Sequence, residues 1–141
     1  MTSGNNRKTI HRHHFFLLLF WAWVVLIIWN SASPGSPDLV SSDKKLVFIR
    51  ADYLAHFIVY FLLSVFFYFW RANENYQIKK KQIYFFLAGG MLMAIGSEFI
   101  QYVTPGRSFN LLDFAANGMG ILAGLIFPGI IFRNNHNKNK S

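Results

Sequence analysis

The sequence predicts an all-α integral membrane protein, in which four transmembrane helices form a compact bundle and both termini are cytoplasmic. Hydrophobic residues make 53% of the 141 residues and aromatic residues 18%, whereas Asp, Glu, Lys and Arg make only 14%. Soluble domains have about 25% charged residues. Four apolar stretches follow one another along the chain, and a helix needs roughly 17–25 residues to cross a bilayer.

The first predicted span covers residues 15–30 and follows a basic N-terminal segment, residues 1–14, which is expected in the cytoplasm. Fifteen consecutive residues of this span are apolar. A cleaved signal peptide is the alternative, because a basic start, an apolar core and small residues occur in that order. The bulky Trp and Phe side chains favour a retained helix, and so does Pro34 directly after the best cleavage position.

Three further spans are predicted at residues 53–70, 83–103 and 111–132. The connections between the spans are too short for a separate soluble domain, so residues 15–132 are predicted to form one membrane domain. Residues 133–141 are rich in Asn and Lys and are expected to form a disordered cytoplasmic tail.

The lysine and arginine residues predict the orientation of the bundle. Ten of the fourteen lie before residue 15, in the 71–82 connection or after residue 132. Cytoplasmic connections carry the excess of these residues, so both termini are predicted inside. Five of the six acidic residues then lie toward the outer side. Topology thus accounts for the net charge of +8, and nucleic acid is not expected as a partner.

Polar side chains recur at helical spacing inside three predicted spans. An ionisable side chain at the bilayer centre costs about 2.5–3.5 kcal/mol, so such residues need a structural or functional reason. Members of each set are three or four residues apart and share one helix face: Asp52, His56, Tyr60 and Ser64 in the second span, Glu98 and Gln101 in the third, and Asp113 and Asn117 in the fourth. All lie toward the predicted outer side, at similar heights.

Arg107 is placed at the outer mouth of the bundle, beside the acidic residues of this predicted cluster. It follows Pro105-Gly106, a turn signal that ends the third helix. Its guanidinium is able to hold a carboxylate or a phosphate through two parallel hydrogen bonds. Two accounts of Glu98 stay open: a salt bridge to Arg107 that fixes the loop, or a substrate or proton site together with His56.

The two aspartates also have structural readings. Asn110-Leu111-Leu112-Asp113 resembles a capping box, with Asn110 as N-cap. Capping alone and capping combined with a functional contact both stay open for Asp113. Asp52 is placed at the start of the second span, where the helix dipole stabilises a carboxylate.

A metal site made of His56, Glu98 and Asp113 is the remaining alternative for the cluster. No short ligand spacing such as H-E-x-x-H supports it, and Arg107 nearby opposes it. We therefore expect no metal and no cofactor.

The same polar positions carry a family resemblance. The series Glu98-x-x-Gln101-x-x-x-Pro105-Gly106-Arg107, followed by Asp113-x-x-x-Asn117-Gly118-x-Gly120, resembles the VanZ-like family of small bacterial membrane proteins. Upstream, Asp52-x-x-x-His56-Phe57-x-x-Tyr60 is similar to the other motif of that family. The resemblance covers roughly residues 50–125. Tyr53 is a departure, because the family more often has lysine directly after this aspartate.

The resemblance implies a multi-pass protein of the bacterial cytoplasmic membrane. The family takes its name from a protein associated with low-level resistance to teicoplanin, a lipid-tailed glycopeptide. A first hypothesis is therefore a protein that binds an anionic amphiphile or envelope precursor at the outer leaflet and affects susceptibility to such antibiotics. Its candidate ligand-binding residues are Asp52, His56, Tyr60, Glu98, Gln101, Arg107, Asp113 and Asn117.

Two other hypotheses stay open. In the first, the protein is an intramembrane enzyme that acts on a lipid-linked substrate, with Glu98 and His56 as acid and base. In the second, it is a structural or partner-binding membrane protein. The sequence shows no Ser-His-Asp set and no phosphate-binding glycine loop. Binding is therefore favoured over catalysis.

Overall fold

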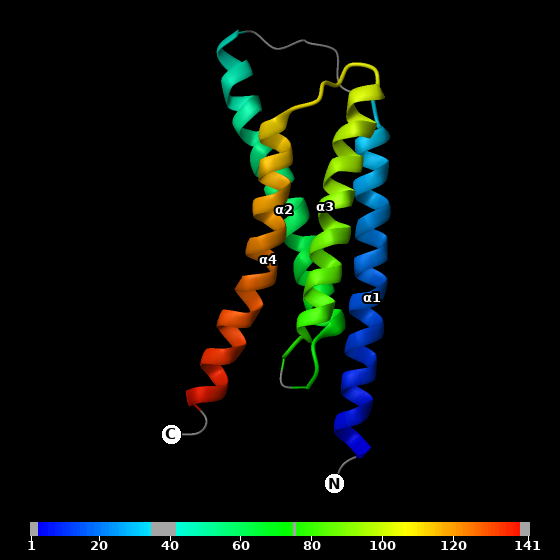
Figure 1. Ribbon diagram of the computed structural model, residues 1–141, viewed down its shortest axis with the longest axis vertical. Helices are drawn as coiled ribbons and strands as arrows, with labels where there is room; N and C mark the ends of the chain where they lie inside the picture. The colour runs from blue at the N-terminus through cyan, green and yellow to red at the C-terminus, as the bar shows by residue number, and fades with distance from the viewer. Residues whose placement is uncertain (1–2, 35–41, 75, 139–141) are drawn as a thin grey trace.

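The computed structural model describes residues 3–34, 42–74 and 76–138 of the chain, with side chains for residues 10–34, 51–74 and 76–132. It contains four helices: α1 (Ser3–Ala32), α2 (Ser42–Arg71), α3 (Lys80–Val103) and α4 (Leu111–Lys138) (Figure 1). Each helix contains a segment long and apolar enough to cross a membrane, and the described residues include no strand. The prediction of an all-α protein with four candidate spans is confirmed.

The helices extend beyond the predicted spans. Helix α2 begins at Ser42, so Asp52 lies well inside it, and the reading of Asp52 as a residue at the helix start is wrong. Helix α4 continues to Lys138, so residues 133–138 are helical where the sequence predicts a disordered tail. A helix already nucleated in its apolar part gains one hydrogen bond for each added residue, which favours its extension.

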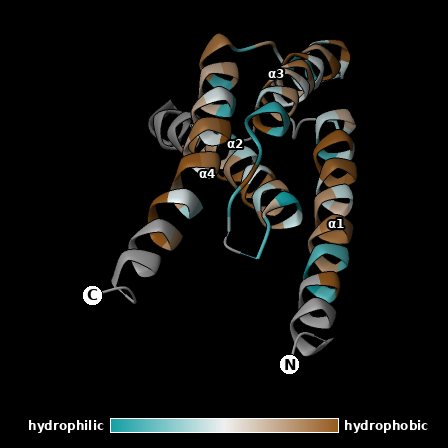
Figure 2. Cartoon of the chain, turned by 60° about the horizontal axis from the view of Figure 1, so that its bottom comes forward, coloured by the Kyte–Doolittle hydropathy of each residue, from teal (hydrophilic) through white to brown (hydrophobic). Residues whose placement is uncertain are grey.

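The described part of the chain has an apolar exterior and a partly polar interior. Large apolar side chains face outward on every helix, among them Trp29, which is 74% exposed, and Phe85, which is 72% exposed. Glu98 and Asn117 are fully buried instead. Figure 2 shows hydrophobic residues along each of the four helices. This distribution suits a hydrocarbon surrounding, where polar groups find partners only inside the protein.

Helices α2 and α4 form the most extensive helix pair, which we call the closed seam. Gly120 and Gly124 make it possible. A Cβ atom built on Gly120 would overlap the carbonyl oxygen of Phe57, and one on Gly124 would overlap that of Phe61. Only glycine therefore allows the two backbones to lie this close, as in other small-residue helix contacts in membranes.

Helices α1, α2 and α3 meet along a second line, which we call the open seam because two cavities lie in it. Aromatic side chains hold it together: the Phe67 and Phe86 rings stack with centroids 4.1 Å apart, and Phe20 packs against both. The Trp23 indole N–H donates to the carbonyl oxygen of Val59 at 2.9 Å, which ties α1 to α2.

Polar contacts also join α1 to the far end of α2. One guanidinium nitrogen of Arg12 donates to the carbonyl oxygens of Ala72 and Asn73, each at 2.9 Å. These carbonyl groups follow the end of α2, where helical partners run out and a cation is favoured by the helix dipole. The start of α1 and the end of α4 lie at this same end of the molecule (Figure 1). Which end faces the cytoplasm stays a prediction.

Candidate functional site

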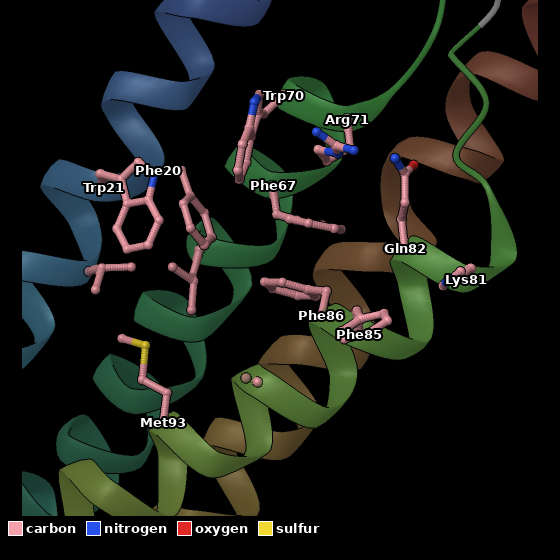
Figure 3. A pocket seen from close by; sticks show the side chains of 14 residues that line it. Phe20, Trp21, Phe67, Trp70, Arg71, Lys81, Gln82, Phe85, Phe86 and Met93 are labelled. Carbon is pink, nitrogen blue, oxygen red and sulfur yellow. The ribbon is translucent and has the colours of Figure 1, made fainter.

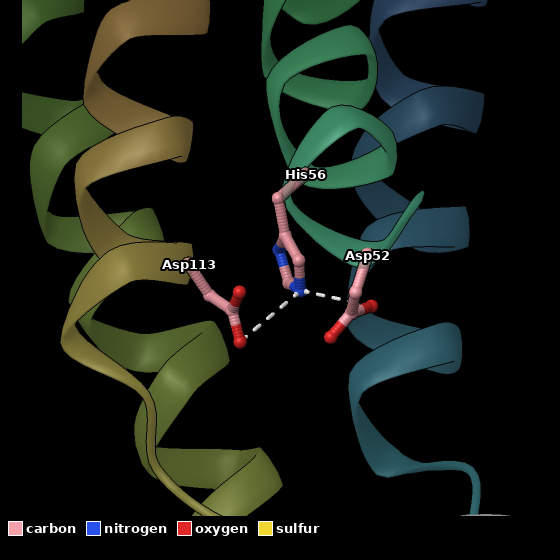
Figure 4. Close-up of side chains that lie close together, drawn as sticks. All are labelled: Asp52, His56 and Asp113. Atoms are coloured by element: carbon pink, nitrogen blue, oxygen red, sulfur yellow. Dashed lines mark ion pairs between the residues drawn. The ribbon is translucent and has the colours of Figure 1, made fainter. Parts of the chain in front are cut away.

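His56 of α2 lies at the centre of the polar residues that the sequence singles out. Its Nε2 atom is 3.8 Å from Oδ1 of Asp52, one turn earlier on α2, and 3.9 Å from Oδ2 of Asp113 on α4. Figure 4 shows both carboxylates converging on this nitrogen. Its Nδ1 atom is 3.9 Å from Oε1 of Glu98 on α3. All three separations exceed hydrogen-bond length, so each is a charge contact at most.

Asn117 connects His56 to Glu98. The Oδ1 atom of Asn117 is 3.0 Å from Nδ1 of His56, and its Nδ2 atom donates to Oε1 of Glu98 at 3.1 Å. An amide oxygen only accepts, so His56 carries a proton on Nδ1 and donates it to Asn117. In neutral His56 the Nε2 lone pair then faces Asp52 and Asp113.

The local sequence around Asn110 explains how α4 contributes to this cluster. The side-chain oxygen of Asn110 accepts from the backbone N–H of Leu112 at 3.0 Å, which makes Asn110 the N-cap. Its Nδ2 atom donates to the hydroxyl oxygen of Tyr53 at 3.4 Å, which links the start of α4 to α2. Asp113 lies in the first turn and faces His56, so the cap is made by Asn110 and Asp113 contacts the cluster.

Two carboxylate oxygens of the cluster have no hydrogen-bond partner among the described residues: Oε2 of Glu98 and Oδ1 of Asp113. Glu98 is fully buried and Asp113 is 3% exposed. A buried acceptor without a partner costs about 1–3 kcal/mol, and more when it is charged. The described residues alone therefore do not supply the donors or the cation that these two oxygens need. One donor atom each from Asp52, His56 and Asp113 lies within 4.8 Å of the other two, so these residues are able to share a cation.

A cavity of about 500 Å³ opens beside this cluster, between α1, α2 and α3. Five of the eight candidate residues line it: Asp52, His56, Tyr60, Gln101 and Arg107. The other three, Glu98, Asp113 and Asn117, do not, so they support the cavity wall from behind. The Tyr60 hydroxyl is fixed by a 2.8 Å hydrogen bond to Ser97, which also lines the cavity.

Helix α1 contributes residues that the sequence analysis missed. Trp23, Trp29, Asn30 and Ser31 all line the cavity. Asn30 and Ser31 are the first polar residues after a long apolar run, which is the one available sequence signal. That signal is also typical of any span that reaches the interface, so it does not single out a site.

Arg107 does not pair with Glu98, so the salt-bridge account of Glu98 is wrong. The Nε atom of Arg107 donates to the carbonyl oxygen of Ser33 at 3.0 Å, and no ion pair involves Arg107 within the described part of the chain. The last carbonyl groups at the end of α1 lack helical partners, which makes them acceptors for a cation. Gly106, with φ of 75°, allows the turn that leads to this position.

The comparisons with known proteins agree with the motif resemblance. Residues 14–132 match the family model described as VanZ/LLP1. No curated protein and no solved structure matches the chain. The family match covers well over half of the chain, including the polar cluster and every residue that lines the cavity beside it. The chain therefore belongs to the VanZ/LLP1 family.

Proposed function

We propose that this VanZ/LLP1 protein binds an amphiphile whose anionic head occupies the polar cavity between α1, α2 and α3. The observation that carries the proposal is Arg107. Its side chain lines the cavity. Its Nε atom donates to the carbonyl oxygen of Ser33, whereas its two terminal nitrogens have no hydrogen-bond partner among the described residues. A guanidinium in this state is able to bind a phosphate or carboxylate with two parallel hydrogen bonds.

The surroundings of the cavity suit a molecule that arrives through the membrane. Leu26 and Trp29 line it and are also exposed on the outer surface of α1, at 53% and 74%. Trp side chains favour the level of the lipid headgroups. An amphiphile in the bilayer therefore reaches this cavity sideways, without leaving the lipid phase.

A second cavity offers space for hydrocarbon. It measures about 690 Å³, and Figure 3 shows the aromatic side chains that line it, among them Phe20, Phe67 and Phe86. Along the open seam the two cavities are neighbours, because Leu63 lines the apolar one and Tyr60, one turn earlier on α2, lines the polar one. A head bound near Arg107 thus has an apolar path beside it for its tail.

The finer proposal concerns the leaflet of the membrane at which the polar cavity lies and the biological role of the protein. The lysine and arginine distribution favours the outer leaflet for the polar cavity. The family resemblance supports a lipid-linked envelope precursor as the ligand and an effect on susceptibility to teicoplanin-type antibiotics. Catalysis with Glu98 as the acid is disfavoured, since Glu98 is fully buried and does not line the cavity.

The test is lipid retention by the purified full-length protein in nanodiscs that contain phosphatidylglycerol and phosphatidylcholine. Wild type is expected to enrich phosphatidylglycerol, measured by mass spectrometry of bound lipid. Arg107→Gln should lose the enrichment about tenfold, because a hydrogen bond to a charged group contributes about 1.5–3 kcal/mol. Lys80→Gln is the control, since it removes the same charge from an exposed position outside both cavities.

A second variant separates binding from folding. Ala55→Phe narrows the cavity from α2 without changing Arg107, so it should also abolish the enrichment while the protein keeps its thermal stability. Equal phosphatidylglycerol enrichment in wild type, Arg107→Gln and Ala55→Phe would refute the proposal.

A further inference from the structure

We infer that Asp52, His56 and Asp113 bind a divalent transition-metal cation, Zn²⁺ in the first place, at the edge of the polar cavity. The three candidate ligand atoms are Nε2 of His56, Oδ1 of Asp52 and Oδ2 of Asp113. This goes beyond the proposed function, because a cation site there does not depend on any amphiphile.

The distances fit a cation better than direct contacts between the side chains. Nε2 of His56 is 3.8 and 3.9 Å from the two carboxylate oxygens. In a tetrahedral zinc site with bonds of about 2.0–2.2 Å, ligand atoms lie about 3.3–3.6 Å apart. The two pairs with Nε2 therefore need to close by only a few tenths of an ångström, whereas the two carboxylate oxygens, which lie within 4.8 Å of each other, need to close by up to about 1.5 Å. Asp52 has a 60% exposed side chain and is free to make this adjustment.

The tautomer of His56 points to the same conclusion. Its Nδ1 proton is donated to Asn117, so the Nε2 lone pair and two carboxylate oxygens face one another without a proton or cation between them. A ligating histidine whose other nitrogen donates to a fixed acceptor is the usual arrangement at metal sites.

The charge around His56 supplies an independent argument. Three carboxylates surround this one imidazole, and no Lys or Arg of the described residues forms an ion pair with any of them. Arg107 lines the same cavity but is turned to the end of α1. Oδ1 of Asp113 and Oε2 of Glu98 are buried and lack hydrogen-bond partners among the described residues as well. A buried carboxyl group is either paired with a cation or protonated, and a metal ion bound here would supply the cation.

The donor set selects the class of cation. One imidazole nitrogen with carboxylate oxygens suits Zn²⁺, whereas Mg²⁺ and Ca²⁺ prefer oxygen donors alone. Three protein ligands leave a fourth position open, as in zinc sites that hold water. Because Asp52 and His56 line the polar cavity, that position faces the cavity. The sequence predicts no metal for two reasons: no short ligand spacing supports one, and Arg107 is placed beside the acids. The structure removes the second reason, because Arg107 donates to Ser33 at the end of α1.

The experiment is a Zn²⁺ titration of the full-length protein, stripped with chelator, freed of any affinity tag and kept without added lipid. We expect one Zn²⁺ per chain by elemental analysis and isothermal titration calorimetry. His56→Ala and Asp113→Asn should each weaken binding at least about 100-fold. Asn117→Leu should weaken it about 10–100-fold, because Asn117 only orients the ligating ring.

The N-terminal histidines provide the control. His11 and His14 are exposed residues far from the cluster in sequence, and His11→Gln/His14→Gln should leave the affinity unchanged. Zn²⁺ binding that this double variant loses and His56→Ala keeps would overturn the inference, as would a preference for Mg²⁺ or Ca²⁺ over Zn²⁺. X-ray absorption of the wild-type complex should show one nitrogen ligand among oxygens. This measurement needs no variant, so a folding defect cannot mask the answer.

The two proposals fail separately. Arg107→Gln keeps all three metal ligands, so it should keep Zn²⁺ binding even where lipid enrichment is lost. Absence of stoichiometric Zn²⁺ binding in wild type overturns the metal inference and leaves the lipid test unaffected.

Discussion

The closed and open seams solve opposite packing problems with the same helix, α2. Toward α4 it meets Gly120 and Gly124, and the two backbones lie so close that no side chain fits between them. Toward α1 and α3 it presents large side chains such as Tyr60 and Phe67, and cavities of about 500 and 690 Å³ remain. The closed seam therefore fixes positions, whereas the open seam leaves room for a ligand.

The polar cluster lies where the two seams meet. The close approach of α4 brings Asn117 and Asp113 to His56, and His56 in turn reaches the cavity of the open seam. Precise placement from one side and accessibility from the other are both needed at a binding site. Changes in the closed seam should therefore affect folding first, and changes in the open seam should affect binding first.

Gly120→Ala is expected to have the largest effect on stability. The added Cβ atom would overlap the backbone of Phe57, which is unable to yield as a flexible side chain would. Overpacking of this kind costs typically 1–3 kcal/mol, and we expect about 3 kcal/mol or more here. Gly96→Ala is the matched control, because nothing lies within 4 Å of its Cβ position. Thermal unfolding in a mild detergent measures the stability of both variants. Equal stability of the two would mean that the α2 and α4 backbones do not lie this close at Gly120.

Asn117→Leu is expected to come second, with a loss of about 2–3 kcal/mol in total. Leucine has a similar size, but it leaves the Nδ1–H of His56 and Oε1 of Glu98 buried without their partner. Asn30→Leu serves as the control, since Asn30 is exposed and the change should stay within about 0.5 kcal/mol. Similar unfolding temperatures for the two variants would show that the connection through Asn117 contributes nothing.

The sequence predicts the features that depend on local spacing. The four apolar stretches, the four-residue spacing of Asp52, His56 and Tyr60, and the cap at Asn110 all follow from neighbours along the chain, and the structure shows each of them. These features depend on helix geometry, which is the same in every helix.

The features that the sequence analysis missed depend on long-range placement. The partner of Arg107 is Ser33, 74 residues earlier in the chain. Nothing in the spacing around Arg107 distinguishes the end of α1 from Glu98 as its acceptor. The apolar cavity is likewise invisible in the sequence, because aromatic residues line it and also cover the lipid-facing surface.

Trp23→Phe is expected to have a smaller effect, confined to the open seam. It removes the 2.9 Å hydrogen bond to the carbonyl oxygen of Val59 and keeps most of the aromatic packing. We expect a loss of about 1 kcal/mol, the usual net contribution of one hydrogen bond. Trp21→Phe is a control without an indole hydrogen bond among the described contacts. A loss above about 3 kcal/mol would instead place the stability of the molecule in the open seam.

The smallest expected effect is a coupling energy near zero between Glu98 and Arg107. Unfolding free energies of Glu98→Gln, Arg107→Met and the double variant form a double-mutant cycle. Groups without shared partners are additive within about 0.3–0.5 kcal/mol. Glu98 is bonded to Asn117 behind the cavity, whereas Arg107 is bonded to the end of α1, so the two single effects should add. In a buried salt bridge, removal of one partner alone would cost about 3–5 kcal/mol and the second change would restore most of it. Stability restored in the double variant would therefore place Arg107 in a salt bridge with Glu98. It would contradict the anionic-head proposal, which needs the terminal nitrogens of Arg107 to be available.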